Sequence, residues 1–186
     1  MKKTVSAICA LAAMLFFSLT NRGMSTDSQG EDGIAFQIVT DKQIYAPRAS
    51  LHVKFIVTNT SEAPFYLSRG LGECSSQFGF AYFLIVDQYD HAVRNQGCAA
   101  DTWPPLGQVD VIKELSDSRS WIKLNPGEIY GGESTFELPS KKGSYRLRAE
   151  LMPPAFSDEQ RRMLSQRGMR VLHSACPAPI VTITVK

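Results

Sequence analysis

The side chains best suited to chemistry in this sequence are its histidines and cysteines. His173 and Cys176 form a His-x-x-Cys pair, the spacing of half a zinc site or of a thiol–imidazole pair. No second pair of ligands at metal-like spacing accompanies them in the sequence. His52 lies on the polar side of an alternating segment and His91 beside a turn. The histidines are therefore expected at the surface, and a metal or thiol protein using His173 and Cys176 is an alternative.

Two aspartates flank the short segment Asp87-Gln88-Tyr89-Asp90. Two carboxylates at this spacing could bind Ca²⁺, but aspartate is also a common turn former, and we favour the turn. The sequence lacks the Gly-x-Ser-x-Gly, His-Glu-x-x-His, P-loop and dinucleotide-binding patterns. We therefore expect no catalytic residues, no metal and no cofactor, in a protein that is not an enzyme.

Aromatic side chains on expected loops are candidates for partner binding. Trp103 precedes two prolines in a long expected loop over residues 97–119, and Tyr89 lies in the turn. Exposed loop aromatics often anchor a binding surface. Trp103 could instead fold back onto the core.

Arginines cluster around an expected helix over residues 157–168. The candidate interaction residues there are Arg161 and Arg162, with Arg167 and Arg170 close by in the sequence. Such a cluster forms either a solvated face or a docking surface for an acidic partner.

The N-terminus has the layout of a bacterial signal peptide. Lys2 and Lys3 precede an apolar run from Thr4 to Thr20. We expect a signal peptide over residues 1–25, a flexible leader over 26–33 and one domain over 34–186. The run is slightly short for a membrane span, although an uncleaved anchor is an alternative. The protein is thus expected to be exported, periplasmic or secreted.

In an exported protein the cysteines are expected to form a disulfide. Cys74 and Cys98 bracket an expected hairpin, which favours a bridge between them. Cys176 precedes the last strand and could pair with either one, or no bridge could form. The sequence does not decide among these arrangements.

The charge balance becomes nearly neutral once the signal peptide is removed. Taking Lys2, Lys3 and Arg22 from the 20 basic residues leaves 17 against 18 acidic ones, a net charge of −1. A near-neutral domain has no electrostatic reason to bind nucleic acid or an anionic membrane. We expect a partner that is another protein or an envelope component.

Short strands dominate the rest of the chain. In residues 51–59, four apolar side chains alternate with polar ones, and residues 144–151 place Arg146 and Arg148 opposite a second apolar face. Residues 34–40, 65–69, 80–86, 121–124, 133–138 and 180–185 are further strands, and Asn125-Pro126-Gly127-Glu128 is a turn. Ser157 and Gln160 form a capping box for the single helix. Seven to eight strands with one short inserted helix indicate an all-β, antiparallel β-sandwich.

Two further patterns have structural explanations. Asn59-Thr60-Ser61 matches the N-glycosylation pattern, and beside a bacterial-type signal peptide we interpret the match as incidental. Gly131-Gly132 is interpreted as flexibility where a strand begins.

Several of these motifs resemble bacterial extracytoplasmic immunoglobulin-like domains. The similarity rests on Tyr45-x-Pro47 before an alternating strand, the Pro126-Gly127-Glu128 turn, and Gly143-Ser144-Tyr145 before a late strand. The last element is similar to the tyrosine corner of immunoglobulin-like sandwiches. Arg48-Ala49 departs from the Gly-Glu that usually follows the first proline. The resemblance covers about residues 34–152 and Ile180–Val185, and it implies an architecture, not an activity.

The leading hypothesis is an exported, non-enzymatic binding or structural module of the bacterial envelope. A weaker resemblance to the bacterial intracellular proteinase-inhibitor domain favours a second hypothesis, a protease inhibitor acting through the 97–119 loop. Cys98 and the prolines after Trp103 would stiffen such a loop.

Overall fold

The computed structural model describes residues 33–71, 80–96 and 110–186. The strands in these ranges are β1 (Ile34–Thr40), β2 (Ile44–Tyr45), β3 (Ser50–Asn59), β4 (Phe65–Ser68), β5 (Phe80–Val86), β6 (Ala92–Gln96), β7 (Trp121–Leu124), β8 (Ile129–Glu137), β9 (Gly143–Met152), β10 (Cys176–Pro177) and β11 (Val181–Val185). The helices are α1 (Val111–Leu115) and α2 (Asp158–Gln166).

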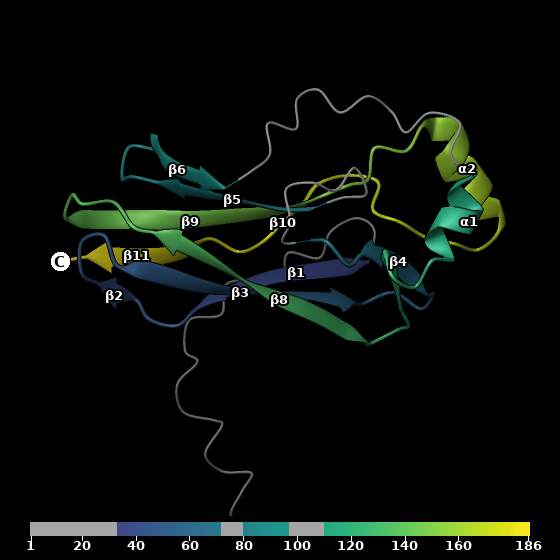
Figure 1. The fold of residues 1–186 in the computed structure, drawn as a ribbon, viewed down its shortest axis with the longest axis horizontal. Helices are drawn as coiled ribbons and strands as arrows, with labels where there is room; N and C mark the ends of the chain where they lie inside the picture. The colour runs from purple at the N-terminus through teal and green to yellow at the C-terminus, as the bar shows by residue number, and fades with distance from the viewer. Residues whose placement is uncertain (1–32, 72–79, 97–109) are drawn as a thin grey trace, which may run out of the picture.

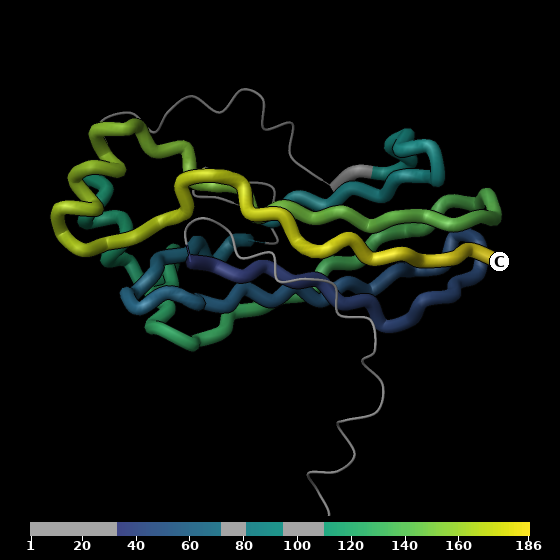
Figure 2. The backbone as a smooth tube through the Cα atoms, turned by 180° about the vertical axis from the view of Figure 1, so that it is seen from behind, coloured from purple at the N-terminus to yellow at the C-terminus, as the bar shows by residue number. Residues whose placement is uncertain are grey.

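The strands form an immunoglobulin-like β-sandwich. One sheet has the order β1-β3-β8, another has the order β2-β11-β9-β5-β6 with β10 also paired to β9, and β4 and β7 form a two-stranded sheet of their own. All of these strand pairs are antiparallel except β2 with β11. Figure 1 shows the two layers packed face to face, and Figure 2 shows the same layers from behind. The predicted fold class is confirmed. The described part of the chain has more strands than the seven or eight predicted, partly because β2 and β10 are too short to show a periodicity.

The core between the layers comes from the predicted alternation. Leu51, Val53, Phe55 and Val57 of β3 are all buried, as are Tyr145, Leu147, Ala149 and Leu151 of β9. The ring of Phe83 from β5 lies 6.3 Å from that of Phe55 and 5.3 Å from that of Phe136, centroid to centroid. Each buried valine, leucine or phenylalanine among them contributes about 1.5–3 kcal/mol by its burial.

The glycine pair of β8 has a different role from the one predicted. Gly131 and Gly132 lie inside β8, not at a flexible entry, and both pair with β3. A side chain at Gly132 would come within 2.5 Å of the Phe55 ring, and one at Gly131 within 2.7 Å of the Phe55 carbonyl oxygen. Glycine is therefore required because Phe55 occupies the space above it.

Asn59 holds the corner where β3 ends. Its side chain is fully buried, and its Nδ2 donates to the carbonyls of Ala63 and Leu124, both at 2.9 Å. Its Oδ1 accepts from the backbone N–H of Ser61 at 3.0 Å. An amide with these bonds cannot carry a glycan, so the interpretation of Asn59-Thr60-Ser61 as incidental is confirmed.

The helices close one end of the sandwich (Figure 1). Val111 and Leu115 of α1 pack with Trp121, Phe156, Leu164 and Val171 in a second apolar cluster. The rings of Trp121 and Phe156 stack at 5.9 Å. The prediction of a continuous loop over 97–119 is wrong for residues 111–115, which form α1; a helix this short shows no periodicity.

α2 lies within the predicted range of 157–168 and begins after Ser157 as expected. The Ser157–Gln160 capping box is present, and Gly168 ends the helix with φ 68°. In the described ranges, no helix is long and apolar enough to cross a membrane.

Candidate functional site

The turn between β5 and β6 is braced by Asp87. Its Oδ1 accepts from the backbone N–H groups of Tyr89 at 2.9 Å and of His91 at 3.0 Å. Desolvation raises the pKa of Asp87, but the N–H groups of His91 and Tyr89 outweigh it and hold that pKa below its usual value. The prediction that this aspartate forms the turn is confirmed.

The braced turn displays an aromatic side chain. Tyr89 is 69% exposed, and its ring centroid lies 6.1 Å from that of His91. His91 Nδ1 lies 3.5 Å from Asp87 Oδ2. The predicted interaction residue Tyr89 is thus at the surface, on a turn whose backbone is held by internal hydrogen bonds.

Two arginines from β9 meet the second aspartate of the turn. Arg146 Nη2 lies 2.7 Å from Asp90 Oδ1, and Arg148 Nη2 donates to the same oxygen. The two arginines stand opposite Val86 and Leu84 of β5, on the outer face of the sheet. Two guanidinium groups thus share one carboxylate, while the other carboxylate of the turn, Asp87, accepts from backbone N–H groups and lies near His91. We call Asp87, Tyr89, Asp90, His91, Arg146 and Arg148 the hairpin site.

The neighbouring turns are fixed by two buried tyrosines. The Tyr45 hydroxyl donates to Asp41 Oδ1 at 2.7 Å and accepts from the N–H of Lys42 at 3.0 Å. Burial, followed by the Asp41 acceptor, raises the pKa of Tyr45 to about 12, while the Tyr45 hydroxyl lowers the pKa of Asp41. The Tyr145 hydroxyl donates to the carbonyl of Lys141 at 2.7 Å. The predicted tyrosine corner is therefore confirmed.

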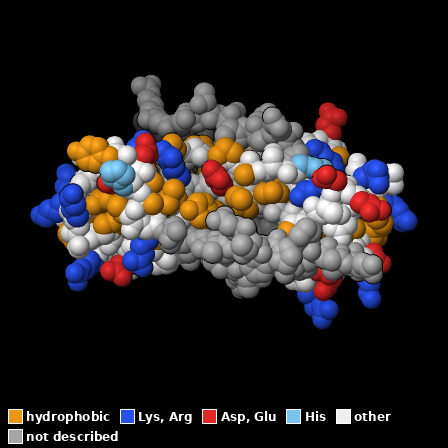
Figure 3. Space-filling view, turned by 90° about the horizontal axis from the view of Figure 1, so that it is seen from above, with side chains coloured by type: hydrophobic (Ala, Val, Ile, Leu, Met, Phe, Trp, Pro, Cys, Tyr) orange, Lys and Arg blue, Asp and Glu red, His pale blue; other side chains and the backbone are white. Residues whose placement is uncertain are grey.

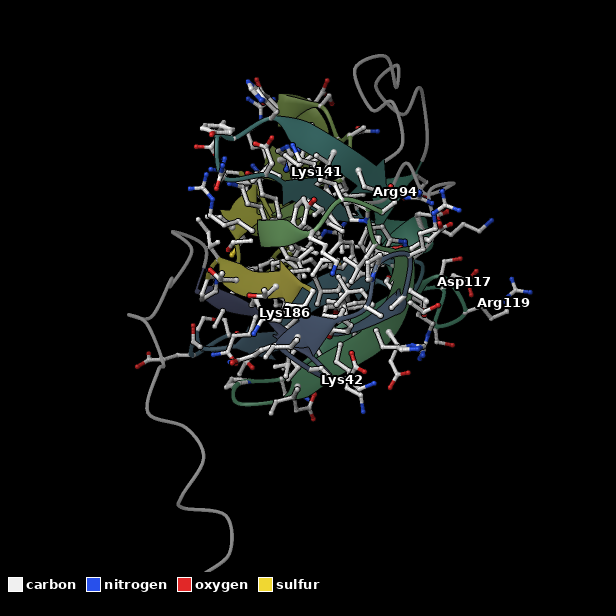
Figure 4. The ribbon with its side chains drawn as sticks, turned by 90° about the vertical axis from the view of Figure 1, so that its left-hand side faces the viewer. Lys42, Arg94, Asp117, Arg119, Lys141 and Lys186 are labelled. Atoms are coloured by element: carbon white, nitrogen blue, oxygen red, sulfur yellow. The ribbon has the colours of Figure 1, made fainter. Side chains whose placement is uncertain are left out.

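These turns carry exposed basic side chains. Lys42 follows β1, Arg48 lies between β2 and β3, and Lys141 and Lys142 lie between β8 and β9. Figure 4 looks onto this end of the sandwich, and the labelled Lys42, Lys186 and Lys141 follow one another across it. We call Lys42, Arg48, Lys141 and Lys142 the basic turns. In the space-filling view from above, Lys and Arg side chains gather towards the two ends, and apolar side chains lie between them (Figure 3).

Arg161 is engaged inside the chain. Its Nε, Nη1 and Nη2 donate to the carbonyls of Phe156, Leu172 and Pro154, at 3.2, 2.7 and 2.7 Å. The guanidinium thus ties α2 to the segments on either side of it, which favours a structural role over the predicted interaction role. Arg162, the other predicted residue, is exposed on α2.

His173 and Cys176 lie in different environments. His173 is exposed, whereas Cys176 is only 2% exposed and its Sγ lies 3.6 Å from the carbonyl oxygen of Ile34. His52 Nδ1 lies 3.3 Å from Thr135 Oγ1, which joins the side chains of β3 and β8. Within the ranges that the structure covers, no three His, Cys, Asp or Glu side chains lie close enough to hold a metal ion.

A shallow depression beside α1 is lined by side chains of both charges. It is lined by Asp110, Lys113, Glu114, Ser116, Asp117 and Arg119. Arg119 lies 3.1 Å from Asp117 and lowers the pKa of that carboxyl through a hydrogen bond. Asp110 caps α1 through the N–H groups of Ile112 and Lys113, so two of the carboxylates here have structural partners and the depression does not present a site of one dominant charge.

Several predictions fall outside the described residues. They are the signal peptide over 1–25, nearly all of the leader over 26–33, the Cys74–Cys98 disulfide, Trp103, and residues 97–109 of the proposed inhibitory loop.

The alternation over residues 144–151 predicts that Arg146 and Arg148 lie on an outer face, but it does not connect them with Asp90. Nothing in the sequence pattern brings the basic turns together. The strand order supplies both connections, and no local pattern in the sequence contains it.

No family model matches the chain, and no curated protein matches it. Among solved structures, the CARDB domain of the PF1109 protein from Pyrococcus furiosus is 12% identical, with 82% of this chain and 87% of that chain covered and a TM-score of 0.41. The C-terminal domain of wzt is 12% identical, with coverages of 84% and 75% and a TM-score of 0.40. The sporulation control protein Spo0M from Bacillus subtilis is 9% identical, with coverages of 83% and 49% and a TM-score of 0.40. The fold class stated above rests on the strand order and layers of this chain itself.

Proposed function

We propose that the protein is an exported, non-catalytic binding module of the bacterial envelope, and that it docks an acidic partner at the hairpin site. The observation that carries the proposal is the exposed Tyr89 on a braced turn, next to two arginines that share one carboxylate. Export is supported by the Lys2–Thr20 segment of the sequence.

The geometry of the turn favours binding over catalysis. The bonds from Asp87 already fix the backbone on both sides of Tyr89, so little conformational entropy is lost when a partner covers the ring. The three histidines lie in different parts of the fold. His173 is exposed whereas Cys176, three residues later, is buried, so the two side chains share no common environment.

The arginines define the chemistry of the partner. A guanidinium presents several N–H donors in one plane and pairs well with carboxylates. Arg146 and Arg148 each use one Nη2 on Asp90 Oδ1, and their side chains are 33% and 40% exposed. Apart from the buried Nε of Arg148, we expect their remaining donors to serve a second acidic group beside Tyr89.

Site-specific photocrosslinking in living bacteria tests the proposal. We would place a photoreactive phenylalanine at position 89, and at position 163 as the matched control, because Met163 is also exposed but lies on α2. We expect a discrete adduct from position 89 and none from position 163. The adduct should weaken when Arg146→Gln and Arg148→Gln are added, since the acidic partner loses its ionic contacts.

Equal adducts from both positions, or none from position 89 in a correctly folded and exported chain, would remove the hairpin site as the binding surface. Circular dichroism of the purified variants checks that each one folds.

A further inference from the structure

We infer that the basic turns, together with Ile44, dock this end of the sandwich onto an anionic phospholipid surface. The inference uses different residues from the hairpin site, so it goes beyond the proposed function and the two can fail independently.

The basic turns form one contiguous surface. The N–H of Arg48 donates to the carbonyl of Pro139 at 3.3 Å, which joins the β2–β3 turn to the β8–β9 turn. The N–H of Lys186 donates to Tyr45 O at 2.9 Å, and Val185 stands opposite both Tyr45 and Gly143. Three chain segments that are far apart in the sequence therefore meet at the same end, where Figure 4 labels Lys42, Lys141 and Lys186.

The fold makes little use of these four side chains. Across the described ranges, Arg48, Lys141 and Lys142 form no side-chain ion pair or hydrogen bond, and Lys42 has one long ion pair, 3.9 Å to Asp41. Asp41 itself accepts the Tyr45 hydroxyl. The carboxylate nearest in sequence to Lys141 and Lys142 is Glu137, which ends β8 opposite Ser50. Four basic side chains are therefore set against the two carboxylates of Asp41 and Glu137. The surface therefore keeps a positive balance that its own fold does not neutralise.

Arg48 is held in a conformation that arginine rarely adopts. Its φ is 58°, in the left-handed region where a glycine would avoid steric strain. Strain of this kind persists where the surrounding structure imposes it, and it is common at functional sites. Arg48 thus combines a strained backbone with a side chain that has no partner among the described residues, which supports a role for its guanidinium outside the chain.

The exposed Ile44 favours a lipid surface over a soluble polyanion as the anionic partner. It lies in β2 between Lys42 and Arg48 in the sequence, and it is 55% exposed. Anionic headgroups attract lysine and arginine, and an apolar side chain beside them can enter the boundary between headgroups and acyl chains. A soluble polyanion would gain nothing from Ile44, so the combination favours a lipid surface.

Cosedimentation with vesicles tests the inference on the exported protein. We would compare vesicles of phosphatidylcholine mixed with phosphatidylglycerol against pure phosphatidylcholine. The Lys141→Gln/Lys142→Gln variant should lower partitioning by about fivefold for each charge removed. The matched control is Arg162→Gln/Arg167→Gln, which removes the same charge from the exposed side of the helical end and should leave partitioning unchanged.

Two single variants sharpen the test. Arg48→Gly should lower partitioning by about fivefold while raising the thermal midpoint, because it removes both the charge and the backbone strain. Ile44→Ser should lower binding to anionic vesicles but leave binding to soluble polyglutamate unchanged.

Equal binding to both vesicle types, or equal losses for the Lys141/Lys142 and Arg162/Arg167 variants, would overturn the inference. So would an Ile44→Ser variant that binds anionic vesicles as the parent does, or inorganic phosphate that displaces the protein from them at moderate ionic strength. A photocrosslink from position 89 that persists in any of these cases would leave the proposed function standing.

Discussion

The two ends of this sandwich are closed by different kinds of interaction. At the helical end, α1 and α2 bury an apolar cluster that contains the stacked rings of Trp121 and Phe156. At the opposite end, the turns are held by polar side chains, with Tyr45, Tyr145 and Asp87 bonded to nearby backbone groups. Figure 1 shows the helices and the β5–β6 turn at opposite ends of the molecule.

The difference between apolar and polar closure explains why exposed binding residues are expected at the turn end of the sandwich. Apolar closure removes side chains from solvent and is costly to break, so it leaves few groups for a partner. Polar closure fixes the backbone with local hydrogen bonds and leaves Tyr89 and the basic turns exposed. We therefore expect substitutions at the helical end to affect mainly stability, and substitutions at the turn end to affect mainly binding.

The largest expected effect is that of Phe156→Ala. The substitution leaves a cavity against Trp121 and should lower the free energy of unfolding by about 3–5 kcal/mol. Urea denaturation of the purified protein measures the change. Met163→Ala, at an exposed position of α2, is the control and should change stability by less than about 0.5 kcal/mol. If Phe156→Ala lowered the free energy of unfolding by less than about 0.5 kcal/mol, as the control is expected to do, the helical cluster would not support the fold.

The second effect is that of Arg161→Met. It leaves the carbonyls of Pro154, Phe156 and Leu172 without this donor and should cost about 1–3 kcal/mol. Arg162→Met changes the neighbouring exposed residue in the same way and should be nearly neutral, so the two urea midpoints should differ clearly. Equal urea midpoints would show that Arg161 has no structural role, and the predicted interaction role would then be favoured.

A smaller effect is expected from Tyr45→Phe, and it depends on pH. Near neutral pH the loss of the hydroxyl should cost about 1 kcal/mol. The pKa of Tyr45 is about 12 in the folded chain against 10.0 for an ordinary tyrosine. Above pH 10 the unfolded chain loses this proton first, so the stabilisation by Tyr45 is complete below pH 10 and is lost as the pH rises towards 12.

Stability measured in steps from pH 9 to pH 12 should therefore fall more steeply in the parent than in Tyr45→Phe. Parallel curves would show that the pKa of Tyr45 is not raised.

The smallest effect is that of Asp90→Asn. Asparagine tolerates the positive φ of 65° at this position, so the change removes only the charge that Arg146 and Arg148 share. Exposed ion pairs contribute little, and we expect a loss of about 0.2–1 kcal/mol that disappears in high salt. A larger, salt-independent loss would show that the hairpin site is a structural element and would weaken the comparison between the two ends.

Local patterns in the sequence predicted much of the fold. The alternation in β3 and β9, the Ser157–Gln160 capping box and the tyrosine corner at Tyr145 each lie within a short stretch of chain, and each is present in the structure. α1 was missed because a five-residue helix is too short to show a periodicity.

The candidate sites depend on contacts that local patterns do not contain. Asp90 meets Arg148 across 58 residues of sequence, and the basic turns come together only through the order of the strands. The near-neutral net charge concealed that grouping, since it averages over the whole chain.

The contact between Phe55 and Gly132 also determines how β8 aligns with β3. In the observed pairing the ring lies over the one residue type that leaves room for it. A slip of two residues in either direction keeps the buried face inward but brings Tyr130 or Ser134 under the ring, where a side chain would clash. The glycine thus excludes the neighbouring alignments, and an edge strand without it would have several pairings of similar energy.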